Sequence, residues 1–137
     1  MSTIITCPFE PTPELQTEDG VLRYLSKLSK LSPKDLCSEL SNVMAAKHNH
    51  MMLPAGLNEY ANKQAVVTDL TDKATAICIH QFGQATVFGV FGGDLRQLNG
   101  LLNSLDEQVA QHDLEPDQHG AMLLEKLGDI LQPESSR

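Results

Sequence analysis

The sequence contains no tryptophan, few aromatic residues, and no hydrophobic run long enough for a membrane helix. Aromatic side chains are 4% of the 137 residues, so a buried core has to be built mostly from aliphatic side chains. No apolar stretch approaches the roughly 20 residues that span a bilayer, which argues against membrane insertion. The first residues, MSTIITCPFEPTP, lack the basic and apolar regions of a signal peptide. We therefore expect a cytoplasmic protein.

Basic residues are also scarce. Ten Lys and Arg residues stand against 18 Asp and Glu residues, which gives a formal net charge of −8. Nucleic acids and anionic membranes attract proteins through a positive surface, so this balance argues against both as partners. The acidity is compatible with a basic protein partner, although ordinary solubility explains it equally well.

Cysteine is limited to Cys7, Cys37 and Cys78, and no C-x-x-C motif is present. An odd number of widely spaced cysteines does not suit a disulfide framework, and reduced thiols in the cytoplasm fit the pattern better.

What the sequence does contain is a set of amphipathic segments in a chain of single-domain length. The clearest helix spans residues 32–52, where Ser32 is a good N-cap and Pro33 occupies the first helical position. Its apolar stripe consists of Leu36, Leu40, Val43 and Met44.

Two further helices follow near the C-terminus. Asp94 is a suitable N-cap for a helix over 95–110, and that helix has one narrow leucine seam. Gly100 lies inside it, either because another backbone approaches closely or because the position merely tolerates glycine. A last helix is predicted over 121–131, whereas segment 20–31 suits either a helix or a strand.

Three strand candidates lie between these helices, at 64–70, 74–81 and 84–92, and a fourth spans residues 3–9. Phe82-Gly83 occupies the place of a tight hairpin turn, where glycine permits a positive φ. Both faces of these strands are apolar, so both faces should be covered. The expected fold is an α/β (α+β) sandwich, with a central antiparallel sheet of about five strands between helices.

The histidines suggest only weak metal chemistry. His48 and His50 lie beside two methionines, a combination that suits a soft metal, but positions i and i+2 of a helix diverge. His112 and His119 flank an acidic loop that matches no zinc pattern. We therefore favour polar histidines in loops and predict no metal site and no cofactor.

Catalytic patterns are equally sparse. Cys78 and His80 would share one strand face and could form a nucleophilic pair, but no third orienting residue is visible. The glycines before Asp94 resemble a phosphate-binding turn, yet the carboxylate itself would occupy that helix start. We predict no catalytic residues and a protein that is not an enzyme.

The order of elements resembles the roadblock (dynein light chain) family, particularly bacterial members that partner a Ras-like gliding-motility GTPase. The matching stretches are EDGVL, SPKDLCSELSNVMAA and ATAICIHQFGQATVFGVFGGDLRQLNGLLNSLDEQV, with GAMLLEKLGDIL as an extra C-terminal helix. A rival resemblance is to profilin, through GQATVFGVF and LLEKLGDIL. A type III secretion chaperone is the third alternative, on composition alone.

The roadblock resemblance divides the single domain into four parts. They are an N-terminal strand and polar connection (1–18), a roadblock-like core (19–112), a C-terminal helix (113–132) and a tail (133–137).

The same resemblance implies a homodimer that joins two sheets through the first strand of the 65–91 group and the helix over 32–50. The expected interface residues are Leu36, Leu40, Val43, Val66 and Thr68. The function expected from the sequence is a non-catalytic regulatory scaffold for a small GTPase or a multi-protein assembly. The alternatives are a chaperone for an extended effector segment and a profilin-like actin-binding protein.

Overall fold

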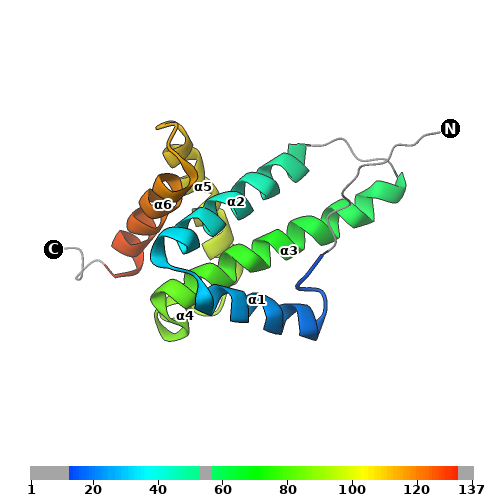
Figure 1. Ribbon diagram of the computed structural model, residues 1–137, viewed down its shortest axis with the longest axis horizontal. Helices are drawn as coiled ribbons and strands as arrows, with labels where there is room; N and C mark the ends of the chain where they lie inside the picture. Colours follow the sequence, from blue (N-terminus) through cyan, green and yellow to red (C-terminus); the bar gives the residue numbers. More distant parts are fainter. Residues whose placement is uncertain (1–12, 53–56, 133–137) are drawn as a thin grey trace.

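The computed structural model describes residues 13–52 and 57–132, and these residues form α-helices and no β-strand (Figure 1). The helices are α1 (Glu18–Lys30), α2 (Pro33–Met52), α3 (Leu57–Phe82), α4 (Gln84–Phe91), α5 (Leu95–Ala110) and α6 (Pro116–Leu131). The predicted α/β sandwich is therefore wrong, and so are the resemblances to the roadblock and profilin families, which rest on that sheet. The strand predicted over 3–9 and the tail over 133–137 lie outside the described residues.

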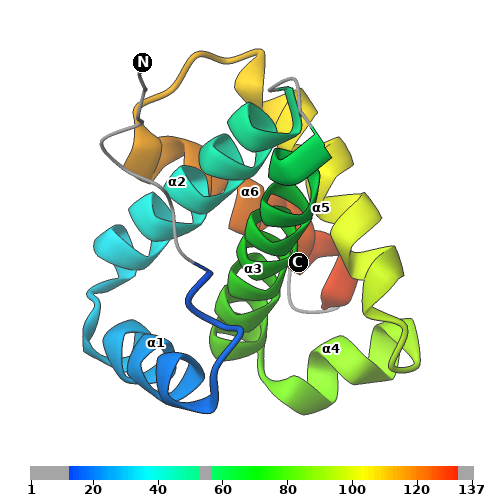
Figure 2. The same ribbon diagram turned by 90° about the vertical axis from the view of Figure 1, so that its right-hand side faces the viewer.

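The long helix α3 runs through the middle of the molecule, and the other helices surround it. Figure 2 shows α1 and α2 on one side of α3, α4 and α5 on the other, and α6 behind it. The most extensive contact joins α2 to α6, followed by the contact of α2 with α3, and α5 packs mainly against α6. The chain thus forms one layered bundle in which α2 links α3 to α6.

Local capping signals place the starts of two helices as the sequence predicts. The Ser32 hydroxyl accepts a hydrogen bond from the Asp35 backbone N–H at 3.1 Å, and α2 begins at the next residue, Pro33. The Asp94 carboxylate accepts one from the Arg96 backbone N–H at 3.1 Å, directly before α5. These contacts satisfy N–H groups that a helix start leaves unpaired.

The segment left open between helix and strand is helix α1. The Thr17 side chain caps it by accepting a hydrogen bond from the Gly20 N–H at 3.0 Å. Tyr24 anchors it to the bundle, because the buried Tyr24 hydroxyl donates to Glu39 at 3.0 Å and Lys73 lies 5.2 Å from the ring centre. Burial and then the Glu39 charge raise the pKa of Tyr24, so its hydroxyl remains a donor.

The first two strand candidates are consecutive parts of α3, and the third is α4. The buried apolar residues of α3 recur at helical spacing: Val66, Ala74, Ile77 and Cys78. Gln64, Thr68 and Asp72 form an exposed polar stripe on this helix. The β-branched Val, Thr and Ile residues between them favour strands locally, which is why the sequence predicts strands here. The hydroxyls of Thr71 and Thr75 donate to carbonyls four residues earlier, at 2.8 and 3.0 Å, which accommodates these residues in a helix.

The predicted hairpin turn at Phe82-Gly83 is a break between two helices. Gly83 does adopt a positive φ of 92°, as a tight turn requires, but it ends α3 and begins α4. The glycine was recognised correctly as a turn residue, whereas the elements on either side of it were not.

The leucine seam of α5 faces the core, as its spacing predicts. Its buried members are Leu98, Leu102, Leu105 and Val109. Together with the apolar stripe of α2 and four buried leucines of α6, they fill the space between the helices. Burial of an aliphatic side chain contributes roughly 1.5–3 kcal/mol, so this seam is a main source of stability.

Helices α6 and α2 cross closely at Gly120. A Cβ atom added at Gly120 would lie 1.9 Å from the carbonyl oxygen of Cys37, so only glycine fits there. Gly100 has nothing within 4 Å of its added Cβ atom and is merely tolerated in α5. The structure thus decides between the two interpretations of Gly100 and assigns close packing to Gly120.

We predict opposite effects of alanine at these two glycines. Gly120→Ala should lower the free energy of unfolding by roughly 1–3 kcal/mol or more, because α2 and α6 have to separate. Gly100→Ala should raise it by about 0.5–1 kcal/mol, because alanine restricts the unfolded chain at an open helical position. Urea denaturation followed by circular dichroism measures both changes. Equal stability of the two variants would contradict the close crossing of α2 and α6.

Candidate functional site

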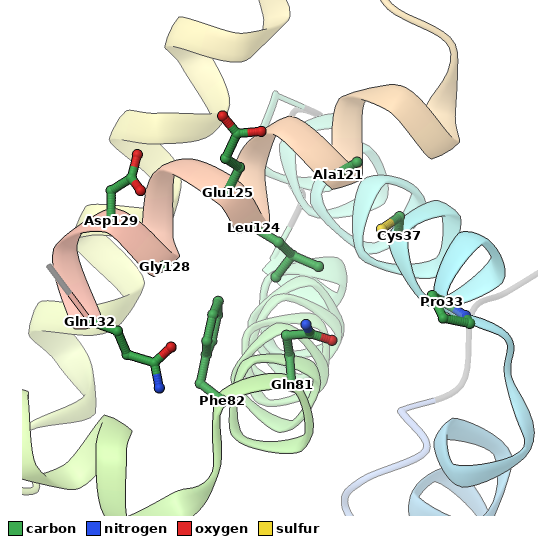
Figure 3. A pocket seen from close by; sticks show the side chains of 10 residues that line it. All are labelled: Pro33, Cys37, Gln81, Phe82, Ala121, Leu124, Glu125, Gly128, Asp129 and Gln132. Carbon is green, nitrogen blue, oxygen red and sulfur yellow. The ribbon is translucent and has the colours of Figure 1, made fainter. Parts of the chain in front are cut away.

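A groove lies between α6, the start of α2 and the end of α3 (Figure 3). Its main part has a volume of about 380 Å³. A second part of about 300 Å³ continues it along α2 and α6, and both parts share Pro33, Cys37 and Ala121. The groove therefore extends beside α6 as one elongated surface.

The floor of the groove is apolar and centres on Phe82, the last residue of α3. Figure 3 shows its ring pointing toward α6 between Leu124 and Gln132. A Cβ atom added at Gly128 would lie 3.3 Å from the Phe82 ring, so glycine lets the ring lie close against α6. Phe82 packs on the core and is only partly buried, which leaves a large apolar side chain in an open groove.

Acidic residues of α6 line the rim of the groove. Asp117, Glu125 and Asp129 line its two parts at spacings of eight and four residues. None of the three takes part in the ion pairs that the described residues form. Lys34 lines the opposite edge near Asp117, so the groove presents three carboxylates and one ammonium group.

Cys37 places a thiol in this groove. Burial and then the Asp117 charge raise the pKa of the Cys37 thiol, so it stays protonated at neutral pH. A protonated thiol is a poor nucleophile, and its position beside the Gly120 crossing makes Cys37 a packing residue at the groove wall.

A second polar cluster lies on the side of α2 that faces α5. Lys47 is 3% exposed, and its ammonium group donates to the side-chain oxygens of Asn99 and Asn103. Asp106 pairs with His119 of α6 at 2.6 Å. Burial lowers the pKa of Lys47, and the Asp106 charge opposes that shift.

This cluster borders two small cavities, of about 130 and 300 Å³, which share His48, Asp106 and Glu107. Because both acceptors of Lys47 and the acceptor of His119 belong to α5, the cluster fixes α5 against its two neighbours. We assign it a structural role.

The five residues expected at a dimer interface, three on the helix over 32–50 and two on a strand edge, do not form one exposed surface. Leu36, Leu40, Val43 and Val66 are buried within the chain's own core, and Thr68 is exposed on α3. The strand edge on which that interface was predicted is part of α3.

Most of the histidines expected in loops lie in helices, and neither of the two candidate residue pairs is brought together. His48 and His50 both lie within α2, where positions i and i+2 diverge, and the His50 ring contacts the Ala46 carbonyl at 3.0 Å. Cys78 is buried in α3, whereas His80 is exposed. Within 13–52 and 57–132, no three His, Cys, Asp or Glu side chains are grouped as metal ligands would be.

The groove residues were not predicted from the sequence, because the helical periodicity of the last helix was recognised only over 121–131. The helix begins at Pro116, and the added turn brings Asp117 into line with Ala121, Glu125 and Asp129. The acidic residues Asp117, Glu125 and Asp129, at spacings of eight and four residues, were the feature of the sequence that could have indicated this rim. Nothing in the sequence indicated that Phe82 lines the groove, because its position depends on where α3 ends relative to α6.

Comparisons with known proteins do not assign this chain to a family. A scan against protein-family models finds no match, and searches of curated proteins and of solved structures find no similar protein. Among the described helices, none is both long and apolar enough to cross a membrane.

We predict that Lys47→Met leaves the free energy of unfolding unchanged or raises it, whereas Lys47→Glu lowers it by about 3 kcal/mol or more. Methionine removes a buried charge, while glutamate would bury a carboxylate near Asp106. The lowered pKa means that folding penalises the charged amine below the ordinary lysine pKa of 10.5, and that this penalty disappears above it. Any advantage of Lys47→Met should therefore shrink as the pH rises toward 10.5 in denaturation experiments.

Thiol alkylation should distinguish the two described cysteines. Iodoacetamide at pH 7.5 should modify Cys37 slowly and leave Cys78 intact, because burial raises the pKa of Cys78 to about 12 and covers its sulfur. Mass spectrometry of the digested protein reads each site separately, and the urea-unfolded chain is the control. Rapid modification of Cys78 in the folded protein would contradict the position of α3 in the core.

Proposed function

We propose that this chain is a non-catalytic interaction module whose α2–α3–α6 groove holds a segment of a partner protein. The observation that supports it is an elongated groove with a partly exposed phenylalanine on its floor, held open between three packed helices. Exposed apolar surface of this kind costs free energy in water, and a partner that covers it recovers that free energy.

The chemistry of the groove supports binding over catalysis. Cys37 is the nucleophilic side chain among the described lining residues, and its raised pKa keeps it protonated. The carboxylates Glu125 and Asp129 stand on the rim and form no ion pair with a basic group among the described residues. General acid–base and nucleophilic catalysis require paired groups at hydrogen-bonding distance, which this groove does not offer.

Most of the more specific functions expected from the sequence lose their structural basis. The GTPase scaffold and the profilin-like actin binder were predicted from resemblances to α/β families, and the sheet-joining homodimer from a strand edge. The described residues contain neither a β-sheet nor a strand edge. The secretion chaperone was suggested by composition alone. The proposal keeps their shared element, a protein partner, and places its contact in the groove.

We also propose a cytoplasmic location. The two described cysteines, Cys37 and Cys78, are free thiols, which suits a reducing compartment.

Ala121→Arg should abolish binding of the partner, because Ala121 is exposed in both parts of the groove and an arginine would fill it. The matched control is Ala110→Arg, an equal substitution at an exposed position at the end of α5. Tagged wild type and both variants are used to isolate partners from the native host, with mass spectrometry as the measurement.

A protein that is retained by wild type and Ala110→Arg but lost by Ala121→Arg supports the proposal. Thermal unfolding verifies that both variants are folded. Partners that remain equally bound to Ala121→Arg would show that the groove is not the contact surface.

A further inference from the structure

We infer that the segment held in the α2–α3–α6 groove is a basic amphipathic helix of the partner protein. This inference rests on the proposed function, and it adds the chemistry and the secondary structure of the bound segment.

The charge of the rim selects a basic segment. Glu125 and Asp129 are one turn apart on α6, and Asp117 lies two turns before Glu125, so carboxylates recur along the wall at about 6 and 12 Å. These groups form no ion pair within the described part of the chain. Lysine or arginine side chains at matching intervals would pair with them at the edge of an otherwise apolar contact.

The opposite wall does not cancel this charge. Lys34 is the cation that lines the groove, and it lies at the Asp117 end, away from Glu125 and Asp129. The formal net charge of −8 adds a long-range attraction for a basic partner. The basic residues of the bound segment should therefore concentrate opposite Glu125 and Asp129.

The walls of the groove favour a helix over an extended segment. They are lined by side chains of α2, α3 and α6, and none of these helices offers a strand edge to a bound segment. An extended segment would find no sheet edge here and would leave its own backbone groups unpaired against an apolar floor. A helix satisfies its backbone internally and presents apolar residues at spacings of three and four to Phe82 and Leu124.

The length of the groove fits such a segment. Asp117 and Gln132 are 15 positions apart on α6, a distance of about 22 Å along the helix axis. A bound helix of about 16 residues would cover the same distance, with its apolar stripe on Phe82 and its basic stripe along the α6 rim.

The test uses three fluorescent peptides of about 16 residues with one identical leucine face. Their polar positions carry lysine, glutamine or glutamate. Fluorescence anisotropy measures their binding to the full chain at low and at physiological salt. The lysine peptide should bind at least tenfold more tightly than the glutamine peptide, the glutamate peptide should bind weakest, and added salt should reduce the preference.

Two double variants localise the effect. Glu125→Lys/Asp129→Lys should weaken binding of the lysine peptide by roughly tenfold or more, because it reverses the charges of the rim. Glu18→Lys/Asp72→Lys is the control, since it reverses two exposed carboxylates on α1 and α3 and changes the net charge equally. An equal loss in both double variants would overturn the inference, because the attraction would then come from net charge alone.

The outcomes separate this inference from the proposed function. If the glutamine peptide binds as tightly as the lysine peptide and Ala121→Arg abolishes both, the groove binds helices without a preference for basic residues, and only this inference fails. If Ala121→Arg changes the binding of none of the three peptides, the peptides do not bind in the groove and this inference fails. The proposed function then fails only if native partners also remain bound to Ala121→Arg.

Discussion

The close crossing of α2 and α6 at Gly120 is the contact on which the rest of the structure depends. A Cβ atom there would meet the backbone of Cys37, so the two helices approach until backbone touches backbone. This crossing makes α2·α6 the most extensive contact of the bundle and sets the separation of the helices on either side of it. The groove begins beside the crossing, at Cys37 and Ala121, and the end of α3 supplies Phe82 as its floor.

Two kinds of polar contact keep the surrounding helices in place. On one side of the bundle, Tyr24, Glu39 and Lys73 attach α1 to α2 and α3. On another side, the ammonium group of Lys47 and the Asp106–His119 pair fix α5. The acidic side chains of the groove rim take part in neither set. Within the described residues, paired polar groups hold the helices together, whereas the carboxylates of the groove rim form no ion pair. This difference is the reason for proposing the groove as a binding surface.

The sequence predicted some elements well and mistook others for a physical reason. Capping residues act within one turn of chain, so Ser32 and Asp94 located helix starts correctly, and the leucine seam of α5 correctly indicated a core face. Helix α3 was mistaken for two strands because its many β-branched residues favour strands locally, whereas packing against α2 and its other neighbours makes the segment helical. The acidic stripe of α6 was visible in the sequence, whereas Phe82 could not be connected with it.

By itself, the sequence determined the local features of this protein: where helices begin, which residues of α2 and α5 are apolar enough for the core, and the acidic balance of the surface. These features depend on neighbours in the chain, so they are readable without a fold. Only the tertiary structure decided that 64–82 is helical, that Gly120 is a contact point while Gly100 is not, and that Phe82 lies beside an acidic rim. Each of these depends on which distant segment packs against the residue, and local propensity carries no information about that neighbour.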